Sequence, residues 1–173
     1  MKEGNKNMKN LDEKFVFCAV MGDSMVGKTS ISETYSKGFF NENSETTVFD
    51  KYVVPLQVAG EEFIISMFDT AGKIENIEKR HSKQTKQKRP VILVGTKIDL
   101  RVGNQDSEVS TDEGVQLAKD IGADCYVECS ARDQKGLKEV FQHVVFSALK
   151  FRKKKTNIFK KMFRRRSASF ANY

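Results

Sequence analysis

The chain carries Gly22-Asp23-Ser24-Met25-Val26-Gly27-Lys28-Thr29-Ser30, which fits the pattern G-x-x-x-x-G-K-[ST] of a phosphate-binding loop. The apolar run from Phe15 to Met21 precedes this loop and is typical of a parallel strand buried on both faces. Ile31 and Tyr35 follow the loop at helical spacing. The alternative is a chance glycine-rich turn between a strand and a helix. Because the whole stretch and both flanks agree with the pattern, we predict a phosphate site at a helix N-terminus, where backbone N–H groups and the macrodipole favour anions.

Two side chains of this loop have predicted roles of their own. Lys28 is expected to reach the β- and γ-phosphates of a nucleotide, and the hydroxyl of Thr29 is expected to ligate Mg²⁺. Asp69-Thr-Ala-Gly72 comes directly after a later strand. The carboxylate of Asp69 can hold a water bound to Mg²⁺, while the amide of Gly72 can approach the γ-phosphate closely. The four-residue string is weak evidence alone and becomes strong after a phosphate loop.

A base-binding segment is predicted further along the chain. Val91–Gly95 is expected to form a second buried strand, and it leads into Thr96-Lys97-Ile98-Asp99. A carboxylate at this point can accept hydrogen bonds from both N1–H and the exocyclic amine of guanine, which adenine cannot supply. Asp99 therefore favours guanine over adenine.

The remaining elements are predicted from periodicity and from cap and turn residues. Val53–Val58 and Phe63–Phe68 are expected to be antiparallel strands turned at Ala59-Gly60, the first of them at a sheet edge because Pro55 cannot donate to a ladder. Ile74–Arg89 is expected to be a solvated helix or an irregular loop. We treat His81 and His143 as structural or solvent-facing.

The second half of the chain has three more predicted elements. Ser110 opens a capping box, and a helix is expected to follow it through Val115, Ala118 and Ile121. Cys125–Cys129 is predicted to be the last strand. The final predicted helix begins at Gly136, and its apolar stripe is expected to be core: Leu137, Val140, Phe141, Val144, Val145, Ala148 and Leu149. The three cysteines are expected to be small, buried hydrophobic residues in a reducing compartment: Cys18, Cys125 and Cys129.

Charge divides the chain into a near-neutral body and a basic tail. Of the 173 residues, 30 are Lys or Arg and 23 are Asp or Glu, giving a net charge of +7. Residues 150–166 hold many of the basic residues and no acidic one. We expect three regions: a disordered N-terminus at 1–11, one domain at 12–149, and a basic amphipathic tail at 150–173.

The tail has two possible roles. Ile158, Phe159, Met162 and Phe163 would share one helical face surrounded by basic residues, which suits an anionic membrane surface. The alternative is a solvated basic end or a nuclear-targeting run. Nucleic acid binding is not expected, because no stacking platform is interleaved with the charges. With no signal peptide and no long apolar run, we expect a cytoplasmic protein, peripheral on membranes and without a prenyl anchor, since no Cys stands at the C-terminus.

Together these motifs resemble those of a small GTPase of the Rho/Rac type within the Ras superfamily, leaning toward the cell-division-control branch. Thr47-Val-Phe-Asp-Lys-Tyr52 and Val127-Glu-Cys-Ser-Ala131 add to the likeness. The resemblance implies an α/β fold, the three-layer P-loop NTPase fold with a mostly parallel doubly wound sheet, and it implies a monomer that binds GTP or GDP with Mg²⁺. It also implies that Phe40 stacks on the base, that Thr47 gives Mg²⁺ a second protein ligand, and that effectors bind Thr47–Tyr52. The nucleotide-binding positions so assigned are Gly22, Asp23, Ser24, Met25, Val26, Gly27, Lys28, Thr29, Ser30, Phe40, Thr47, Asp69, Gly72, Thr96, Lys97, Asp99, Ser130 and Ala131.

The chain departs from this family at three single positions. Lys73 stands where the family has the Gln that orients the attacking water, and a Lys has no carbonyl to accept from that water, so hydrolysis should be slow. Ser24 replaces the Gly against which an arginine finger packs, which puts the action of exchange and activating proteins in doubt. Ser44 replaces a Tyr that closes over the phosphates.

A larger departure follows Lys73, where the family's switch helix and its next strand are missing. That strand would lie in the middle of the sheet, between the strand before the phosphate loop and Val91–Gly95. Either these two strands pair directly, or the fold is loose and the site incomplete. Three functional hypotheses remain open: a slow GTP switch, a binding module that does not cycle, and a shortened chain without a stable GTP site.

Overall fold

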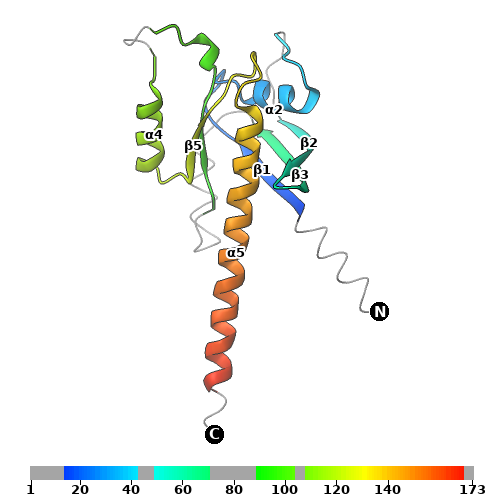
Figure 1. Cartoon of the computed structure of the whole chain (residues 1–173), viewed down its shortest axis with the longest axis vertical. Coiled ribbons are helices and arrows are strands. Elements are labelled where there is room, and N and C mark those ends of the chain that lie inside the picture. Colours follow the sequence, from blue (N-terminus) through cyan, green and yellow to red (C-terminus); the bar gives the residue numbers. More distant parts are fainter. Residues whose placement is uncertain (1–13, 43–48, 71–88, 104–107, 170–173) are drawn as a thin grey trace.

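The computed structural model describes residues 14–42, 49–70, 89–103 and 108–169, and in the last range it does not describe the side chains after Lys153. The elements in chain order are β1 (Phe15–Val20), α2 (Lys28–Lys37), β2 (Phe49–Val58), β3 (Glu61–Thr70), β4 (Ile92–Gly95), the 3₁₀ turn η1 (Ile98–Leu100), α4 (Thr111–Asp120), β5 (Cys125–Glu128) and α5 (Leu137–Ser169). The described strands form two sheets, β1-β3-β2 and β4-β5 (Figure 1). The predicted α/β class is confirmed.

The three-stranded sheet contains the predicted hairpin. β2 and β3 pair antiparallel, and β3 pairs parallel to β1. Ala59 and Gly60 join the hairpin with φ angles of 51° and 80°, the pair of positive values that matches the twist of the flanking strands. β2 lies at the edge of the sheet, as Pro55 predicted. Both strands are longer than predicted, since β2 begins at Phe49 and β3 ends at Thr70.

β1 and β4 do not pair with each other. The sequence left open whether these two strands would meet after the loss of the strand between them. In the described part of the chain β1 pairs with β3 alone and β4 with β5 alone. The central ladder is therefore not restored, and the predicted single doubly wound sheet is divided in two.

The divided sheet corrects two predictions of burial. β1 is not buried on both faces: Val16 is 2% exposed, but the adjacent Phe17 is 68% exposed and stacks on Phe68 with ring centroids 6.3 Å apart. Val16 is buried because α2 and α5 pack on its face of the sheet, whereas Phe17 lies on the opposite face. β4 is also not a buried strand, because its four residues are only half-buried in a sheet of two strands.

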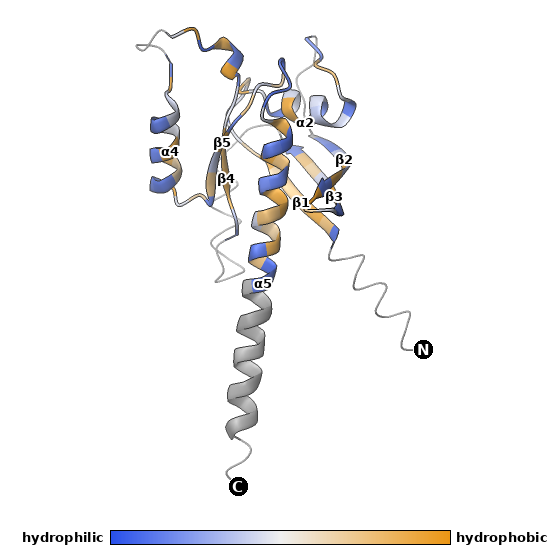
Figure 2. Cartoon of the chain, in the orientation of Figure 1, coloured by the Kyte–Doolittle hydropathy of each residue, from blue (hydrophilic) through white to orange (hydrophobic). Residues whose placement is uncertain are grey.

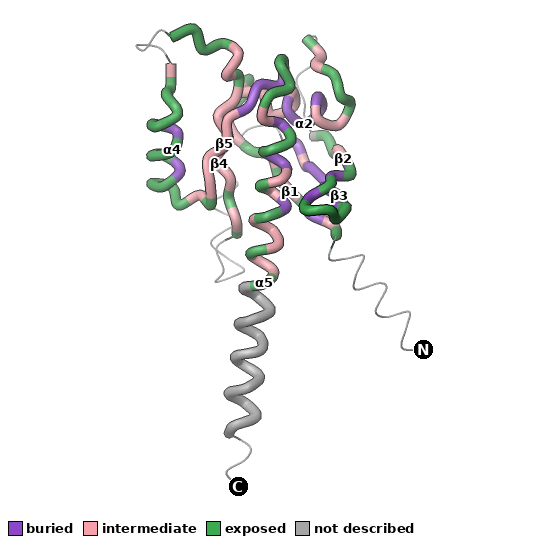
Figure 3. Tube along the Cα trace, in the orientation of Figure 1, coloured by how far each residue is buried: buried purple, intermediate pink, exposed green. Residues whose placement is uncertain are grey.

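The face of β1 that holds Val16 lies in one apolar core with α5. Figure 2 shows apolar residues along β1 and the upper turns of α5, and Figure 3 shows buried residues gathered where these elements meet. The predicted stripe of α5 is confirmed as core, with Val144, Ala148 and Leu149 packed partly buried at its margin. Phe141 packs on Tyr35 of α2 at 4.1 Å between ring centroids. Because α5 contacts strands of both sheets, it holds the two sheets together.

The turn before α5 depends on a glycine. Gly136 has φ 71°, and a Cβ atom at this position would stand 2.2 Å from the carbonyl oxygen of Glu128. The loop after β5 can therefore lie against the strand only with glycine here.

α4 begins at the predicted cap, and only part of it is buried. Ser110 caps it, accepting from the backbone N–H of Glu113 while Glu113 accepts in return. Gly114 and Ala118 are buried, but Val115 and Ile121 are exposed, because α4 covers only the small sheet. The predicted helix through Val115, Ala118 and Ile121 is present, with Ile121 as its C-cap.

The cysteines and the tail complete the comparison with the sequence. Cys129 is buried as expected, whereas Cys18 and Cys125 are half-buried, and Cys125 Sγ lies 3.6 Å from Nδ1 of the exposed His143. α5 continues without a break past Lys150 to Ser169. No helix in the described residues combines the length and hydrophobicity needed to cross a bilayer. Residues 1–11, Ser44, Ile74–Lys88 and His81 lie outside the described residues.

Candidate functional site

Parallel pairing brings the phosphate loop and Asp69 together. In the register of β1 and β3, Val20 lies opposite Asp69, so both strands end at the same edge of the sheet. The loop leaves β1 at this edge, where open α/β sheets bind ligands. The hydroxyl of Thr29 donates to Oδ2 of Asp69 at 2.5 Å. The two side chains predicted to serve Mg²⁺ thus lie in direct contact.

The loop itself has the backbone of an anion cradle. Gly22, Met25 and Gly27 have φ angles of 150°, 62° and 95°. Gly27 is the N-cap of α2; no side chain caps this helix, and no acidic residue stands in its first turn. Its first N–H groups and the positive end of the helix dipole are therefore directed at the loop. The side chain of Lys28 folds back across the loop and donates to the carbonyl of Asp23 at 2.5 Å.

Asp69 is the most deeply buried charged group of the site. It has no exposed surface, and its Oδ1 atom is buried without a hydrogen-bond partner in the described residues. Burial raises the pKa of this carboxyl, and Asp50 adds to the rise, while the hydrogen bond from Thr29 and the charge of Lys28 oppose it. A buried carboxylate oxygen without a donor requires a cation or a water to be stable as a charge.

These atoms fit the magnesium ion that the sequence predicts. Mg²⁺ prefers carboxylate and hydroxyl oxygens and keeps several of its waters, so Thr29 could ligate it directly and Asp69 through a water. No cluster of three or more His, Cys, Asp or Glu side chains in the described ranges could hold a metal. If a phosphate is bound by the loop, a cation held by Thr29 and Asp69 would offset part of its negative charge.

A second strand pair positions the predicted base-binding residues. β4 and β5 run parallel with Gly95 opposite Glu128, and the segments with Thr96–Asp99 and Ser130-Ala131 follow them. Lys97 has a left-handed backbone, φ 58°, and begins the turn η1 that carries Asp99. The hydroxyl of Ser130 donates to Oδ1 of Asp99 at 2.6 Å. This hydroxyl also accepts from the backbone N–H of Asp133 at 3.0 Å, which fixes its direction.

Two hydrogen bonds join the base-binding segment to the phosphate loop. The hydroxyl of Thr96 donates to the carbonyl of Val26 at 2.7 Å, and Nζ of Lys97 donates to the carbonyl of Met25 at 2.7 Å. The stem of Lys97 also lies over the loop, since a Cβ atom at Gly27 would be 3.8 Å from its Cε. Although the two sheets do not pair, their loops meet at one site.

Most of the predicted site residues that the structure describes lie in these two loops. Phe40 is half-buried and packs against the core, and Ala131 is buried within it. Thr47, Gly72 and Lys73 lie outside the described residues, so their roles stay predictions. Sequence reasoning missed Arg101 and the polar role of Glu128, which contact each other beside η1. The only sequence signal for this pair is that Tyr126 and Glu128, two positions apart on β5, share one face of the strand.

The sequence model of the Ras family matches this chain over residues 17–78 and 73–150. The two matched segments overlap at residues 73–78, just after Asp69-Thr-Ala-Gly72, where the sequence predicts that a switch helix and a strand are missing. They contain both loops of the site and all the described strands except the first two residues of β1. The chain therefore belongs to the Ras family, and its α/β structure agrees with a truncated form of the small GTPase fold.

Proposed function

We propose that this protein is a Rho-type guanine nucleotide switch that binds GTP or GDP with Mg²⁺ and hydrolyses GTP slowly. The observation that carries this proposal is the pair of hydrogen bonds from Thr96 and Lys97 to the phosphate loop. They hold a base-recognising segment and a phosphate cradle next to each other, as one nucleotide requires. A chain that had lost nucleotide binding would have no need of this arrangement.

The preference for guanine rests on Asp99. Its carboxylate is half-buried at the end of β4, and Ser130 occupies Oδ1 with a 2.6 Å hydrogen bond. A carboxylate held in this way can accept from N1–H and the exocyclic amine of guanine together. Adenine presents an unprotonated N1 to the same carboxylate, so a site of this kind discriminates strongly against it.

Slow hydrolysis is proposed from two positions of the sequence. Lys73 follows Asp69-Thr-Ala-Gly72 where a Gln would orient the attacking water, and Ser24 stands where a Gly would admit an arginine finger. An ammonium group donates hydrogen bonds only, so it cannot accept from the water as a Gln carbonyl does. Ser24 is exposed in the phosphate loop, where its side chain would obstruct an incoming group.

The surfaces for partners are also proposed. Effectors would bind Thr47–Tyr52, of which Asp50 and Lys51 are exposed on the edge strand β2. An anionic cytoplasmic membrane would bind the basic residues of 150–166, which α5 carries away from the nucleotide site (Figure 1). Each basic residue near such a surface contributes about 1 kcal/mol. Vesicles rich in phosphatidylserine should retain the protein at moderate salt and lose the variant Lys160→Glu/Lys161→Glu; equal retention of both proteins would contradict this role.

A second function, a binding module that does not cycle, is favoured by the division of the sheet, because an incomplete sheet leaves the catalytic side of the site without a full framework. Single-turnover hydrolysis of bound GTP separates the two. The switch predicts measurable phosphate release that becomes faster in Lys73→Gln. If GTP binds and neither protein releases phosphate, the non-cycling module is correct and the switch is wrong.

A further inference from the structure

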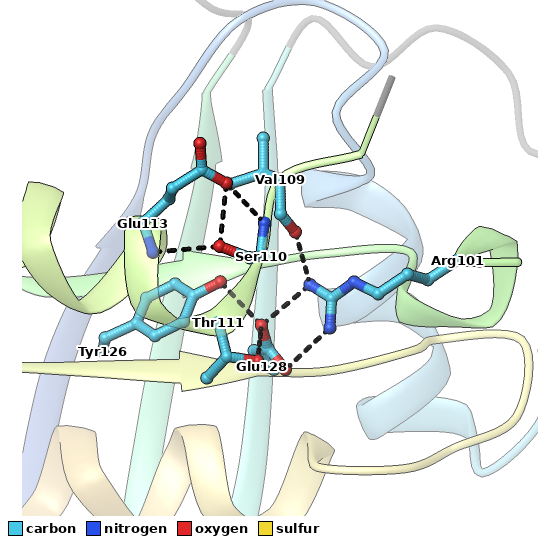
Figure 4. Close-up of polar contacts among 7 residues, drawn as sticks. All are labelled: Arg101, Val109, Ser110, Thr111, Glu113, Tyr126 and Glu128. Carbon is cyan, nitrogen blue, oxygen red and sulfur yellow. Dashed lines mark hydrogen bonds and ion pairs between the residues drawn. The ribbon is translucent and has the colours of Figure 1, made fainter. Parts of the chain in front are cut away.

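A group of polar side chains lies beside η1, the turn that carries Asp99, and has no assigned contact with the nucleotide. Three of them donate to the carboxylate of Glu128 at the end of β5 (Figure 4). Arg101 donates from Nη2 to Oε1 at 2.8 Å and from Nη1 to Oε2 at 3.2 Å. Tyr126 and Thr111 donate their hydroxyls to Oε1 at 3.0 and 3.1 Å. The group thus links η1, β5 and the first residue of α4.

Glu128 and Arg101 form more than a loose surface pair. Their side chains are 20% and 33% exposed, and the guanidinium meets both carboxylate oxygens. Such two-pronged, charge-assisted contacts are directional as well as strong. Nη2 of Arg101 also donates to the carbonyl of Val109 at 3.0 Å, which ties the same side chain to the segment before α4.

Tyr126 is fixed by close packing between two glycines. A Cβ atom at Gly95 of β4 would stand 2.3 Å from its hydroxyl oxygen, and one at Gly114 of α4 would stand 2.2 Å from its Cζ. Only glycine at both positions leaves room for the ring between β4 and α4. The backbone at Gly95 and Gly114 therefore fixes the Tyr126 hydroxyl, which donates to Glu128, from two sides.

The turn that carries Asp99 is anchored at three points. Its first N–H, that of Ile98, donates to the carbonyl of Cys129 at 3.4 Å, and Ser130 holds the carboxylate of Asp99. The third anchor is Arg101. Its backbone N–H donates to the carbonyl of Ile98 at 3.2 Å, and its side chain is held by Glu128. All three anchors lead back to the segment from Glu128 to Ser130.

We propose that Arg101 and Glu128 are positioning residues for base recognition: they fix the turn Ile98–Leu100 so that Asp99 meets the exocyclic amine of guanine. This inference rests on the proposed function. A site whose base-binding carboxylate is carried on a three-residue turn needs that turn to be rigid, because displacement of reacting or bonding atoms by even a fraction of an ångström weakens a two-point hydrogen bond.

The test compares GDP with inosine diphosphate, which has N1–H but no exocyclic amine. Affinities of the full chain for GDP, inosine diphosphate and ADP are measured by titration calorimetry in Mg²⁺ buffer. In Glu128→Gln we expect the preference for GDP over inosine diphosphate to fall by about tenfold. The reason is that Asp99 would no longer be held where it accepts from the exocyclic amine, and one hydrogen bond to a charged group is worth about this much. Glu62→Gln is the matched control, because Glu62 accepts from Gln57 at 3.3 Å in the distant β2-β3 hairpin. It should keep the native preference.

Two further variants keep the test decisive if Glu128→Gln does not fold. Tyr126→Phe removes one donor and keeps the ring between the glycines, and Arg101→Lys keeps the charge and loses the fork. Both should lower the same preference, and combining Arg101→Lys with Glu128→Gln should add little to the larger single effect. Equal losses of GDP and inosine diphosphate affinity, or an unchanged preference, would overturn the positioning role. A native chain that fails to prefer GDP over ADP would instead overturn the proposed function.

Discussion

The hydroxyl of Ser130 donates a 2.6 Å hydrogen bond to Oδ1 of Asp99, and these residues come from segments that follow different strands of the small sheet. The bond fixes the carboxylate that we assign to the guanine base. Ser130 has no exposed surface, and its own backbone N–H donates to the carbonyl of Lys135 at 2.9 Å. The orientation of Asp99 is therefore set by the protein before any ligand binds.

Ser130→Ala should weaken GDP binding by about tenfold through the loss of this hydrogen bond to a charged group. ADP binding should not change. Competition titrations against a fluorescent GDP analogue measure both affinities. Ser147→Ala in α5 is a matched control and should bind as the native chain does. Equal GDP affinity in Ser130→Ala and the native chain would show that Asp99 does not depend on Ser130.

Asp69→Asn tests the proposed magnesium site. The variant removes a buried charge whose Oδ1 atom has no described partner, so the nucleotide-free protein should lose little stability in thermal unfolding. Its GDP affinity in Mg²⁺ should fall by about tenfold or more, as is typical when a group behind a metal-bound water is lost. With EDTA present, the variant and the native chain should bind alike. The control is Asp50→Asn, because Asp50 is a nearby exposed carboxylate, and this variant should still bind GDP more tightly when Mg²⁺ is added. If Mg²⁺ raised the GDP affinity of Asp69→Asn as much, Asp69 would not have this role.

Stability should fall in acid partly through Glu128. The hydrogen bond from Arg101 lowers the pKa of this carboxyl below its ordinary value of 4.5, helped by Tyr126 and Thr111 and opposed by partial burial. A carboxyl whose pKa is lower in the folded state stabilises the fold fully above its unfolded pKa, and this contribution is lost as pH falls through the folded pKa.

Urea unfolding of the native chain and of Glu128→Gln should therefore differ most near neutral pH. The difference should shrink as the pH drops below 4.5, the ordinary value for this carboxyl. Glu62→Gln serves again as the control. A difference that stays constant across this range would mean that Glu128 is not held as a carboxylate by Arg101.

Val16 and Phe17 test the division of the sheet. They are neighbours in β1, with exposed fractions of 2% and 68%. Val16→Ala should lower the free energy of unfolding by about 2 kcal/mol through lost burial and a cavity. Phe17→Thr should cost less than about 1 kcal/mol, the scale of an exposed aromatic contact. If Phe17→Thr proved the more damaging change in urea unfolding, the face opposite α5 would be covered.

Local signals explain what could be predicted from the sequence. The phosphate loop, the Ser110 cap and the Ala59-Gly60 turn each depend on residues a few positions apart, so their patterns identify them directly. The stripe of α5 is equally local, because one helix presents it. Thr29 and Asp69 were both predicted to serve Mg²⁺, and the parallel pairing of β1 with β3 brings them into contact.

Tertiary pairing explains what could not be predicted. An apolar run such as Phe15–Met21 does not say whether a second layer or a neighbouring strand is present, so the exposure of Phe17 was missed. Arg101 and Glu128 meet across 27 positions of sequence, and neither belongs to a pattern that signals the other.

The central claim is that one nucleotide is held by Gly22–Ser30 and selected by Asp99. The most direct test measures the affinity of the folded, full-length protein for GTP and for ATP in Mg²⁺, together with the same measurements on Lys28→Ala. We expect GTP to bind far more tightly than ATP, and Lys28→Ala to lose most of the GTP affinity because we assign its ammonium to the phosphates. A folded protein that binds GTP and ATP alike, or is indifferent to Lys28→Ala, would contradict the claim.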